Sequence, residues 1–130
     1  MLAACILTFA LNAGIDPDLV HAVIKTESNY KSDAVGFVGE IGLLQVRPEY
    51  VPETAEELKK PCVNIRRGVS ILAEAKKLCR HKLDKTWVNC YNLGVVGGSK
   101  IKYPKLFPYY KKVIANYNII KEEKSATKQR

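Results

Sequence analysis

Apolar side chains recur every three or four residues over most of the chain, which is the spacing typical of amphipathic helices. Residues 2–13 form a nearly continuous apolar run, which predicts a first buried helix. A second helix is predicted from Asp16, whose carboxylate suits an N-cap before Pro17. The apolar face of this second helix is formed by four side chains, Leu19, Val20, Val23 and Ile24.

The second half of the chain continues the helical pattern. Gly94 suits a C-terminal helix cap, and residues 95–100 are expected to form a glycine-containing loop. The further helices that we expect are residues 54–60, 63–80, 86–93 and 108–120. The buried face of the longest one is formed by Ile65, Val69, Leu72, Ala75 and Cys79.

These patterns predict a mainly α protein with one domain. A chain of 130 residues is long enough for one hydrophobic core and too short for two. We therefore expect a helical domain over residues 1–120, followed by a charged, flexible tail over residues 121–130. Because no apolar run reaches 18 residues, we expect no membrane span, and we expect a monomer.

Charge is distributed unevenly along the chain. Residues 1–58 carry three Lys/Arg against nine Asp/Glu, a net charge of −6, whereas residues 59–130 carry eighteen against four, a net charge of +14. Such a basic half attracts polyanions such as nucleic acid, anionic lipid or an anionic cell-wall polymer. The alternative is a solvated lysine-rich surface.

Four cysteines permit three disulfide pairings. Cys62 and Cys79 lie at opposite ends of one predicted helix, about 25 Å apart at 1.5 Å per residue, which is too far for a disulfide. If disulfides form, we favour Cys79–Cys90, across a short turn, with Cys5–Cys62 as the second pair. Free buried thiols are the alternative. No Cys-x-x-Cys motif occurs, and we expect no metal and no cofactor.

Glu27 is the strongest candidate for acid catalysis. It continues the apolar face of the second predicted helix, four residues after Val23 and three after Ile24. Burial on such a face raises the pKa of a carboxyl group, so that it can donate a proton near neutral pH. Schemes based on a serine or cysteine nucleophile are disfavoured, because His21 and His81 are the only histidines and neither lies in a suitable motif.

Several motifs together resemble the lytic transglycosylases with a goose-lysozyme-like catalytic fold. A helix ending in Glu27-Ser28, with an aromatic residue two positions later at Tyr30, matches the first family motif. Three further matches follow in the family's order, Gly42-Leu43-Leu44-Gln45, Asn64-Ile65-x-x-Gly68-Val69 and Cys90-Tyr91-Asn92-Leu93-Gly94. The resemblance covers residues 6–118 and implies a lysozyme-like helical domain.

The family resemblance also implies a reaction and a set of site residues. Glu27 would be the single catalytic residue, cleaving the β-1,4 bond between N-acetylmuramic acid and N-acetylglucosamine with formation of a 1,6-anhydromuramyl product. Gln45 and Tyr91 would line the cleft, and Tyr30 would contact substrate. Ser28 and Asn92 would support them, with helix capping and turn formation as their alternative roles.

The sequence departs from the family pattern at a few apolar positions. Leu44 stands where the family has methionine, and Cys90 and Leu93 stand where it has alanine. We expect these changes to reshape the saccharide groove. The family's Ser-x-Gly-Ala approach to the second motif is also absent, and residues 36–41 replace it with a segment that includes Glu40.

Two other functions remain open at the level of sequence. A hydrolytic lysozyme would use Glu27 with a second carboxylate, Asp33 or Glu40, to activate water. A non-catalytic protein would instead use the basic C-terminal half to hold an anionic polymer. We favour the transglycosylase, with glycan strands of peptidoglycan and anionic wall polymers as partners and no nucleic acid.

The expected location follows from the expected substrate. An enzyme of peptidoglycan works outside the cytoplasm, in the periplasm or cell envelope, or belongs to a phage. The first apolar run has no Lys or Arg before Lys25. It therefore gives no clear export signal, and we interpret it as the first helix.

Overall fold

The computed structural model describes the backbone of residues 1–129 and the side chains of residues 1–128. Within these residues the regular elements are helical, and the remaining pairing consists of two isolated bridges, Val35–Ile41 and Ile41–Val46. The α-helices are α1 (Leu2–Asn12), α2 (Pro17–Ser28), α3 (Ala55–Leu58), α4 (Pro61–Leu78), α5 (Val88–Ser99) and α6 (Pro108–Gln129). The short 3-10 helices are η1 (Pro48–Tyr50), η2 (Leu83–Lys85) and η3 (Pro104–Leu106).

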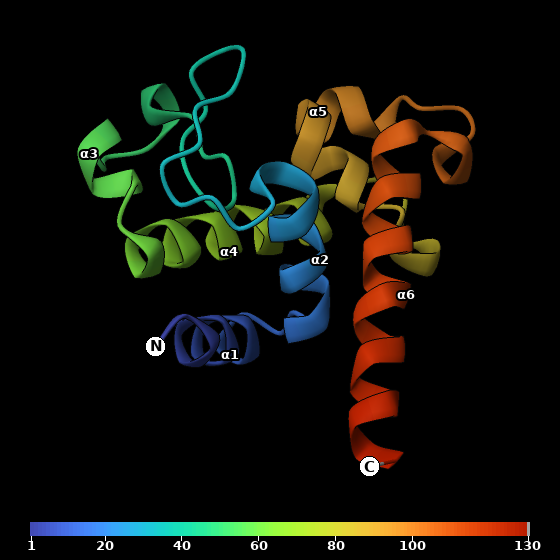
Figure 1. Cartoon of the computed structure of the whole chain (residues 1–130). Coiled ribbons are helices and arrows are strands. Elements are labelled where there is room, and N and C mark those ends of the chain that lie inside the picture. The colour runs from blue at the N-terminus through green and yellow to red at the C-terminus, as the bar shows by residue number, and fades with distance from the viewer. Residues whose placement is uncertain (130) are drawn as a thin grey trace.

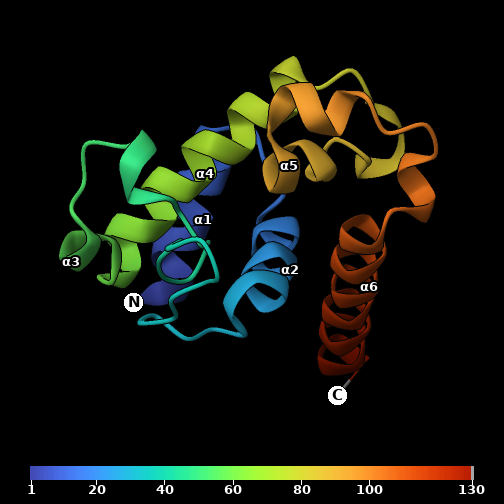
Figure 2. The ribbon, with the colours of Figure 1, turned by 90° about the horizontal axis from the view of Figure 1, so that it is seen from above.

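Helix α2 lies at the centre of the molecule, with α1 below it, α4 crossing behind it and the long α6 standing alongside (Figure 1). Seen from above, α5 and the loop of residues 29–47 lie on different sides of the C-terminal end of α2 (Figure 2). The core joins side chains from all of these helices. Its fully buried members include Ile6, Val20, Ile24, Ile65, Leu72, Val88 and Val113. The prediction of a mainly α domain is confirmed.

The predicted start of α2 is confirmed in detail. Asp16 is its N-cap, and Asp16 Oδ1 accepts a hydrogen bond of 2.9 Å from the backbone N–H of Asp18.

No helix in the described part of the chain combines the length and apolar character that a membrane crossing requires.

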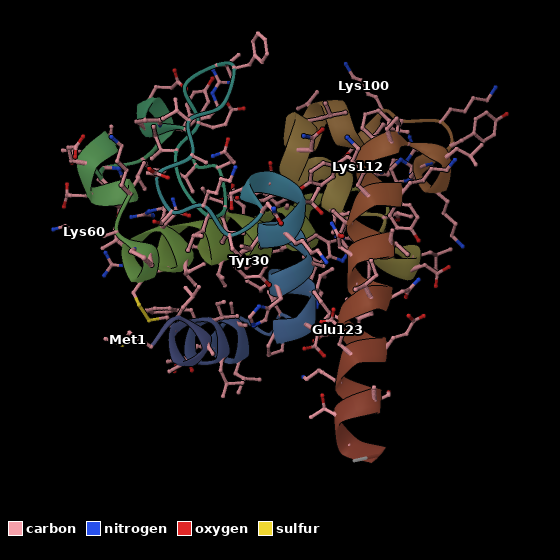
Figure 3. All side chains as sticks on the ribbon, in the orientation of Figure 1. Met1, Tyr30, Lys60, Lys100, Lys112 and Glu123 are labelled. Carbon is pink, nitrogen blue, oxygen red and sulfur yellow. A yellow bond between two sulfur atoms is a disulfide. The ribbon has the colours of Figure 1, made fainter. Side chains whose placement is uncertain are left out.

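Two disulfides join the helices. Cys5–Cys62 connects α1 to the first turn of α4, and its yellow bond is visible between those helices in Figure 3. Cys79–Cys90 connects the end of α4 to α5. The Cα–Cα distances are 5.8 and 5.9 Å. The favoured pairing is therefore confirmed, and the free-thiol alternative is wrong.

Helix α5 extends further than its sequence predicts. Gly94 has φ 83° and ψ 159°, which breaks the helix without ending it, and helical structure resumes up to Ser99. The predicted loop over residues 95–100 is therefore wrong. The second segment folds back closely on the first, because Gly98 lies so near Cys90 that a Cβ atom there would come within 2.6 Å of the Cys90 Cα.

Helix α6 also continues beyond its predicted end at residue 120. Lys121 and Lys124 reach back to the buried carboxylate of Asp18 in the first turn of α2, with N–O distances of 3.1 and 2.8 Å. These ion pairs favour helix where the charge pattern predicted a tail. Residues 121–129 are helical, Arg130 lies outside the described residues, and the flexibility of this segment stays a prediction.

Candidate active site

A cleft of about 620 Å³ opens where the end of α2 meets the segment of residues 40–51, α4 and the first half of α5. Four of the residues predicted from the sequence line this cleft together. They are Glu27 from α2, Gln45 from the loop, and Tyr91 and Asn92 from α5. Residues up to 65 positions apart in the sequence therefore share one concave surface.

Glu27 is the most perturbed carboxyl group in the cleft. It lies one residue before the end of α2, on the face that carries the core residues Val23 and Ile24. Burial raises its pKa from 4.5 to about 7, and the negative charge of Glu40 adds to the increase. Tyr109 opposes both effects, because its hydroxyl donates a hydrogen bond of 2.8 Å to Glu27 Oε2. At neutral pH both protonation states of Glu27 are therefore populated.

Two tyrosines keep their protons beside this carboxyl group. Burial, and then the charge of Glu27, raise the pKa values of the Tyr91 and Tyr109 hydroxyls well above their usual range. Both hydroxyls therefore act as hydrogen-bond donors. Tyr109 donates to Glu27, and Tyr91 donates to the backbone carbonyl of Leu44.

The turn that carries Gln45 is held from three sides by polar side chains. Ser28 Oγ donates to the carbonyl of Leu43 at 2.9 Å, and Tyr91 donates to the carbonyl of Leu44. From α4, the fully buried Asn64 accepts from the Leu44 N–H at 2.8 Å and donates to the carbonyl of Ile41 at 2.8 Å. The motifs that are separate in the sequence thus meet on one turn.

Gln45 adopts a left-handed backbone conformation, with φ 50°, at the cleft wall. Its side-chain Nε2 donates to the carbonyls of Gly42 at 2.9 Å and Ala34 at 3.2 Å, which sets the orientation of the amide. Gly36 lies close to this side chain, because a Cβ atom on it would come within 2.6 Å of Gln45 Oε1 and within 2.2 Å of Glu40 Oε1, so that a larger residue would displace both side chains.

The two candidate second carboxylates have different positions. Glu40 lines the cleft, and its Oε1 accepts a hydrogen bond of 2.9 Å from the backbone N–H of Val38. Asp33 is exposed and does not line the cleft. Of the two alternatives that the sequence left open, only Glu40 lies where it acts electrostatically on Glu27.

Two predicted substrate-binding residues lie outside the cleft lining. Ser28 is buried beneath the turn, where it joins α2 to the loop. Tyr30 lies on the outer side of α2, where its hydroxyl is 2.8 Å from His21 Nδ1 (Figure 3). The structure therefore does not bring Tyr30 to the other predicted residues.

The three apolar residues that depart from the family pattern lie at different depths relative to the cleft. Cys90 and Leu93 line the cleft, as expected for residues that shape a groove. The same expectation is wrong for Leu44, which is fully buried and packs so closely on Gly68 that a Cβ atom there would come within 2.3 Å of Leu44 Cδ1. The backbone carbonyl of Leu44 accepts a hydrogen bond from a cleft residue, Tyr91.

Sequence reasoning missed Tyr109 as the partner of Glu27. The two residues are 82 positions apart, and no spacing rule links them. In the sequence, the position of Tyr109 at the start of α6 indicated that its side chain is buried, but not which residue it contacts. Sequence reasoning also missed the anchoring role of Asn64, although an Asn within an otherwise apolar helix face indicates a buried hydrogen-bonding group.

The described residues contain no group of three or more His, Cys, Asp or Glu side chains arranged to hold a metal ion. The cleft brings together Glu27, whose pKa is about 7, with Tyr91 and the Gln45 amide, and Tyr109 hydrogen-bonds to Glu27 from beside the cleft.

Comparisons with known proteins give a family, one relative and one solved structure of similar fold. The family model described as the transglycosylase SLT domain matches residues 4–129. A protein of Escherichia coli O157:H7, described as a peptidoglycan-binding-like protein, is 27% identical over 128 residues, covering 83% of this chain and 72% of its own. An inactive mutant of the lytic transglycosylase Slt from Pseudomonas aeruginosa has the same fold, with a TM-score of 0.74 and 20% identity. That match covers 95% of this chain but only 24% of the Slt chain.

Proposed function

The chain belongs to the family of transglycosylase SLT domains, and on this premise we propose that it is a peptidoglycan lytic transglycosylase. In this proposal it cleaves the β-1,4 bond between N-acetylmuramic acid and N-acetylglucosamine and leaves a 1,6-anhydromuramyl end. The observation that carries the proposal is Glu27, a half-buried carboxyl group in a cleft with a pKa of about 7.

The first step is protonation of the glycosidic oxygen by Glu27. Because Tyr109 donates to Oε2, the proton of the acid is best carried on Oε1. Its transfer allows the bond from C1 of the muramyl sugar to the departing oxygen to break. The positive charge that develops at C1 is then stabilised by the acetamido oxygen of the same sugar, so no nucleophile from the protein is required.

The second step returns the proton to Glu27. The carboxylate now present takes the proton of the muramyl 6-hydroxyl, whose oxygen attacks C1 and displaces the acetamido oxygen. The 1,6-anhydro ring closes, and no water is consumed. A carboxyl group with a pKa near neutrality serves both steps, since it is neither a weak donor nor a weak acceptor of protons. The hydrogen bond from Tyr109 stabilises the ionised form of Glu27, which exists between the first and the second step.

The remaining cleft residues position the substrate in this proposal. Gln45 and Tyr91, which line the same cleft as Glu27, would orient the sugar at the reacting centre. Asn92 is exposed on the α5 wall, where it can contact a sugar hydroxyl or acetamido group. Ser28 acts indirectly, by holding the turn that carries Gln45. Tyr30 has no role in this proposal.

The decisive experiment is digestion of purified peptidoglycan, with mass spectrometry of the released fragments and Glu27→Gln as the paired variant. We expect fragments ending in anhydromuramic acid from the wild-type protein. We expect a loss of cleavage of at least about a thousandfold in Glu27→Gln, whose amide cannot donate the required proton. Retained cleavage in this variant would remove the mechanism.

Hydrolysis is the second candidate, because Glu40 lines the same cleft and acts on Glu27 by its charge. Fragments carrying an added water would establish it, and Glu40→Gln would then abolish activity. A transglycosylase predicts a different result for Glu40→Gln. Removing the negative charge lowers the pKa of Glu27, so cleavage persists and its decline with rising pH begins at lower pH.

We further propose glycan strands as the partner in the cleft and anionic wall polymers as partners of the basic half. The location that follows is the periplasm or cell envelope, or a phage that attacks the wall. The rival interpretation, a non-catalytic binder, predicts that the digestion releases no fragments from peptidoglycan although the protein sediments with it.

A further inference from the structure

A second cavity, of about 530 Å³, lies outside the cleft. It is formed by the connection between α4 and α5 and by the segment between α5 and α6. We call it the basic pocket, and its lining residues are 80–83, 86 and 102–106. Both segments lie on the side of α5 away from the loop of residues 29–47 (Figures 1 and 2). A ligand bound there is therefore separate from a glycan in the cleft.

The two cavities differ in the sign of their available charge. Glu27, Glu40 and Glu74 line the cleft, and its two arginines are each paired with a glutamate, Arg47 with Glu49 and Arg67 with Glu53. The basic pocket is lined by four cationic side chains, and no carboxylate occurs among its lining residues. The charges of the lining residues therefore favour an anionic ligand in the basic pocket and disfavour it in the cleft.

The cations of the basic pocket are available to different degrees. Lys105 pairs with Asp84, and Lys82 Nζ donates to the carbonyls of Lys76 and Lys77 at the end of α4. No ion pair within the described residues involves Arg80 or Lys102. Arg80 and Lys102 are therefore the positive charges that a ligand can neutralise.

The pocket also offers apolar and aromatic surface. The Tyr103 ring and the Leu83 and Leu106 side chains line it and are 61%, 77% and 64% exposed. Exposed apolar side chains gathered at one cavity are typical of a binding site. The Nε2 atom of His81 is buried in the same region and has no hydrogen-bond partner within the described residues.

The pocket is held in shape by contacts between its two segments. Asn89 Nδ2 donates to the carbonyl of Pro104 at 3.0 Å, and the Tyr110 hydroxyl donates to the carbonyl of Asp84 at 3.0 Å. The ion pair between Lys105 and Asp84 joins the same two segments. A pocket with such ties is largely formed before a ligand binds, which reduces the entropy cost of binding.

We propose that the basic pocket binds a sugar-phosphate polymer of the cell wall, an inference that rests on the proposed function for its location at the wall. Arg80 and Lys102 recognise phosphate groups. Lys102 Nζ lies over one face of the Tyr103 ring, 5.5 Å from its centroid, and the other face of this exposed ring packs against a sugar. A nucleic acid fits less well, because continuous binding of a single strand uses several aromatic rings in succession and the pocket offers one. An anionic membrane fits less well, because the apolar side chains line a hollow instead of projecting from the surface.

The test measures binding in the Glu27→Gln background, so that cleavage does not change the ligand and the outcome does not depend on the proposed reaction. The probe is poly(ribitol phosphate) carrying N-acetylglucosamine, titrated by calorimetry at several salt concentrations. The Arg80→Gln/Lys102→Gln variant should lose about tenfold or more in affinity, and its salt slope should fall by about one to two.

The matched control removes the same charge elsewhere. Lys60 and Lys112 are exposed basic residues outside the basic pocket, and both are labelled in Figure 3. Lys60→Gln/Lys112→Gln should change affinity by less than about threefold. Equal losses in the two double variants would overturn the proposal, because binding would then follow net charge alone. Thermal unfolding of each variant excludes loss of fold as the cause.

A second variant tests the sugar contact. Tyr103→Ala should weaken binding of the glycosylated polymer and leave binding of sodium polyphosphate, which has no sugar, nearly unchanged. Equal losses for both probes would contradict the assigned role of Tyr103. Tighter binding of single-stranded DNA, or of vesicles containing an anionic phospholipid, at equal phosphate concentration would replace the wall polymer with that ligand.

Discussion

At the scale of single residues, the site depends on opposing effects on one carboxyl group. Burial raises the pKa of Glu27 strongly, the charge of Glu40 raises it further, and the Tyr109 hydrogen bond lowers it. The result is about 7, because the desolvation effect is the largest. Each neighbour can therefore be tested by the direction in which its removal moves the pH dependence.

Tyr109→Phe removes the hydrogen bond and keeps the ring. The ionised form of Glu27 loses a donor, so its pKa should rise by about one unit, which corresponds to a charged hydrogen bond of about 1.4 kcal/mol. The decline of kcat/KM with rising pH should move upward by the same amount. Glu40→Gln should move it downward. A profile that is unchanged in Tyr109→Phe would show that this hydroxyl does not act on the catalytic group.

The raised pKa of Glu27 also has a consequence for stability. The native state keeps this proton up to about pH 7, whereas the unfolded chain loses it near 4.5. This retained proton contributes to the free energy of unfolding. The contribution is fully present below pH 4.5 and is lost as pH rises through 7, a change on the order of 3 kcal/mol.

Glu27→Gln should abolish that dependence, because its amide stays neutral. We expect the variant to be more stable than the wild-type protein by about 2–3 kcal/mol at pH 8, and nearly equal to it at pH 4. Urea unfolding at the two pH values measures both differences. Equal stability at pH 8 would mean that ionisation of Glu27 costs little in the native state.

At the scale of elements, the two disulfides have different relations to the cleft. Cys5–Cys62 joins α1 to the start of α4, and neither cysteine lines the cleft. Cys79–Cys90 joins the end of α4 to α5, directly before Tyr91. The first spans 57 residues and the second 11. Chain entropy thus makes the first more important for stability, while position makes the second more important for function.

Replacing each pair by serine separates these roles. Loss of Cys5–Cys62 should cost about 4 kcal/mol of unfolding free energy, and loss of Cys79–Cys90 about 3. Activity should follow the opposite order at a temperature where both variants are folded. Cys79→Ser/Cys90→Ser should lose on the order of tenfold or more in kcat/KM, because displacement of Tyr91 disturbs substrate position. Equal losses in the two variants would indicate a general effect of stability.

At the scale of the whole molecule, charge is divided between two cavities that lie on different sides of α5. The acidic first half of the chain supplies two carboxyl groups of the cleft, Glu27 and Glu40, and the basic second half supplies the cations of the basic pocket. The net charge of +8 therefore does not describe the cleft. Cleavage and attachment should respond differently to salt.

Sedimentation with walls that retain their anionic polymers should weaken by about tenfold or more between 50 and 500 mM NaCl, since screening and counterion release oppose such contacts. Cleavage of short soluble glycan fragments should change by less than about twofold. The comparison uses walls stripped of anionic polymers as the control. Attachment that is insensitive to salt would contradict a role for the basic half.

Much of the architecture was determined by local sequence. The apolar periodicity predicted α1, α2, α4 and the first part of α6, because amphipathic faces must be buried wherever they pack. The same face placed Glu27 among core residues and so predicted its raised pKa. The family resemblance then added Gln45, Tyr91 and Asn92, which line one cleft with Glu27.

Only the tertiary structure decided which distant groups meet. Tyr109 reaches Glu27 across 82 positions, and Asn64 bonds to a turn that is 20 positions earlier in the chain. Tertiary contacts also favour the longer α6, since Lys121 and Lys124 pair with Asp18. Local pattern specifies which face of a helix is buried, but it does not specify what lies opposite that face.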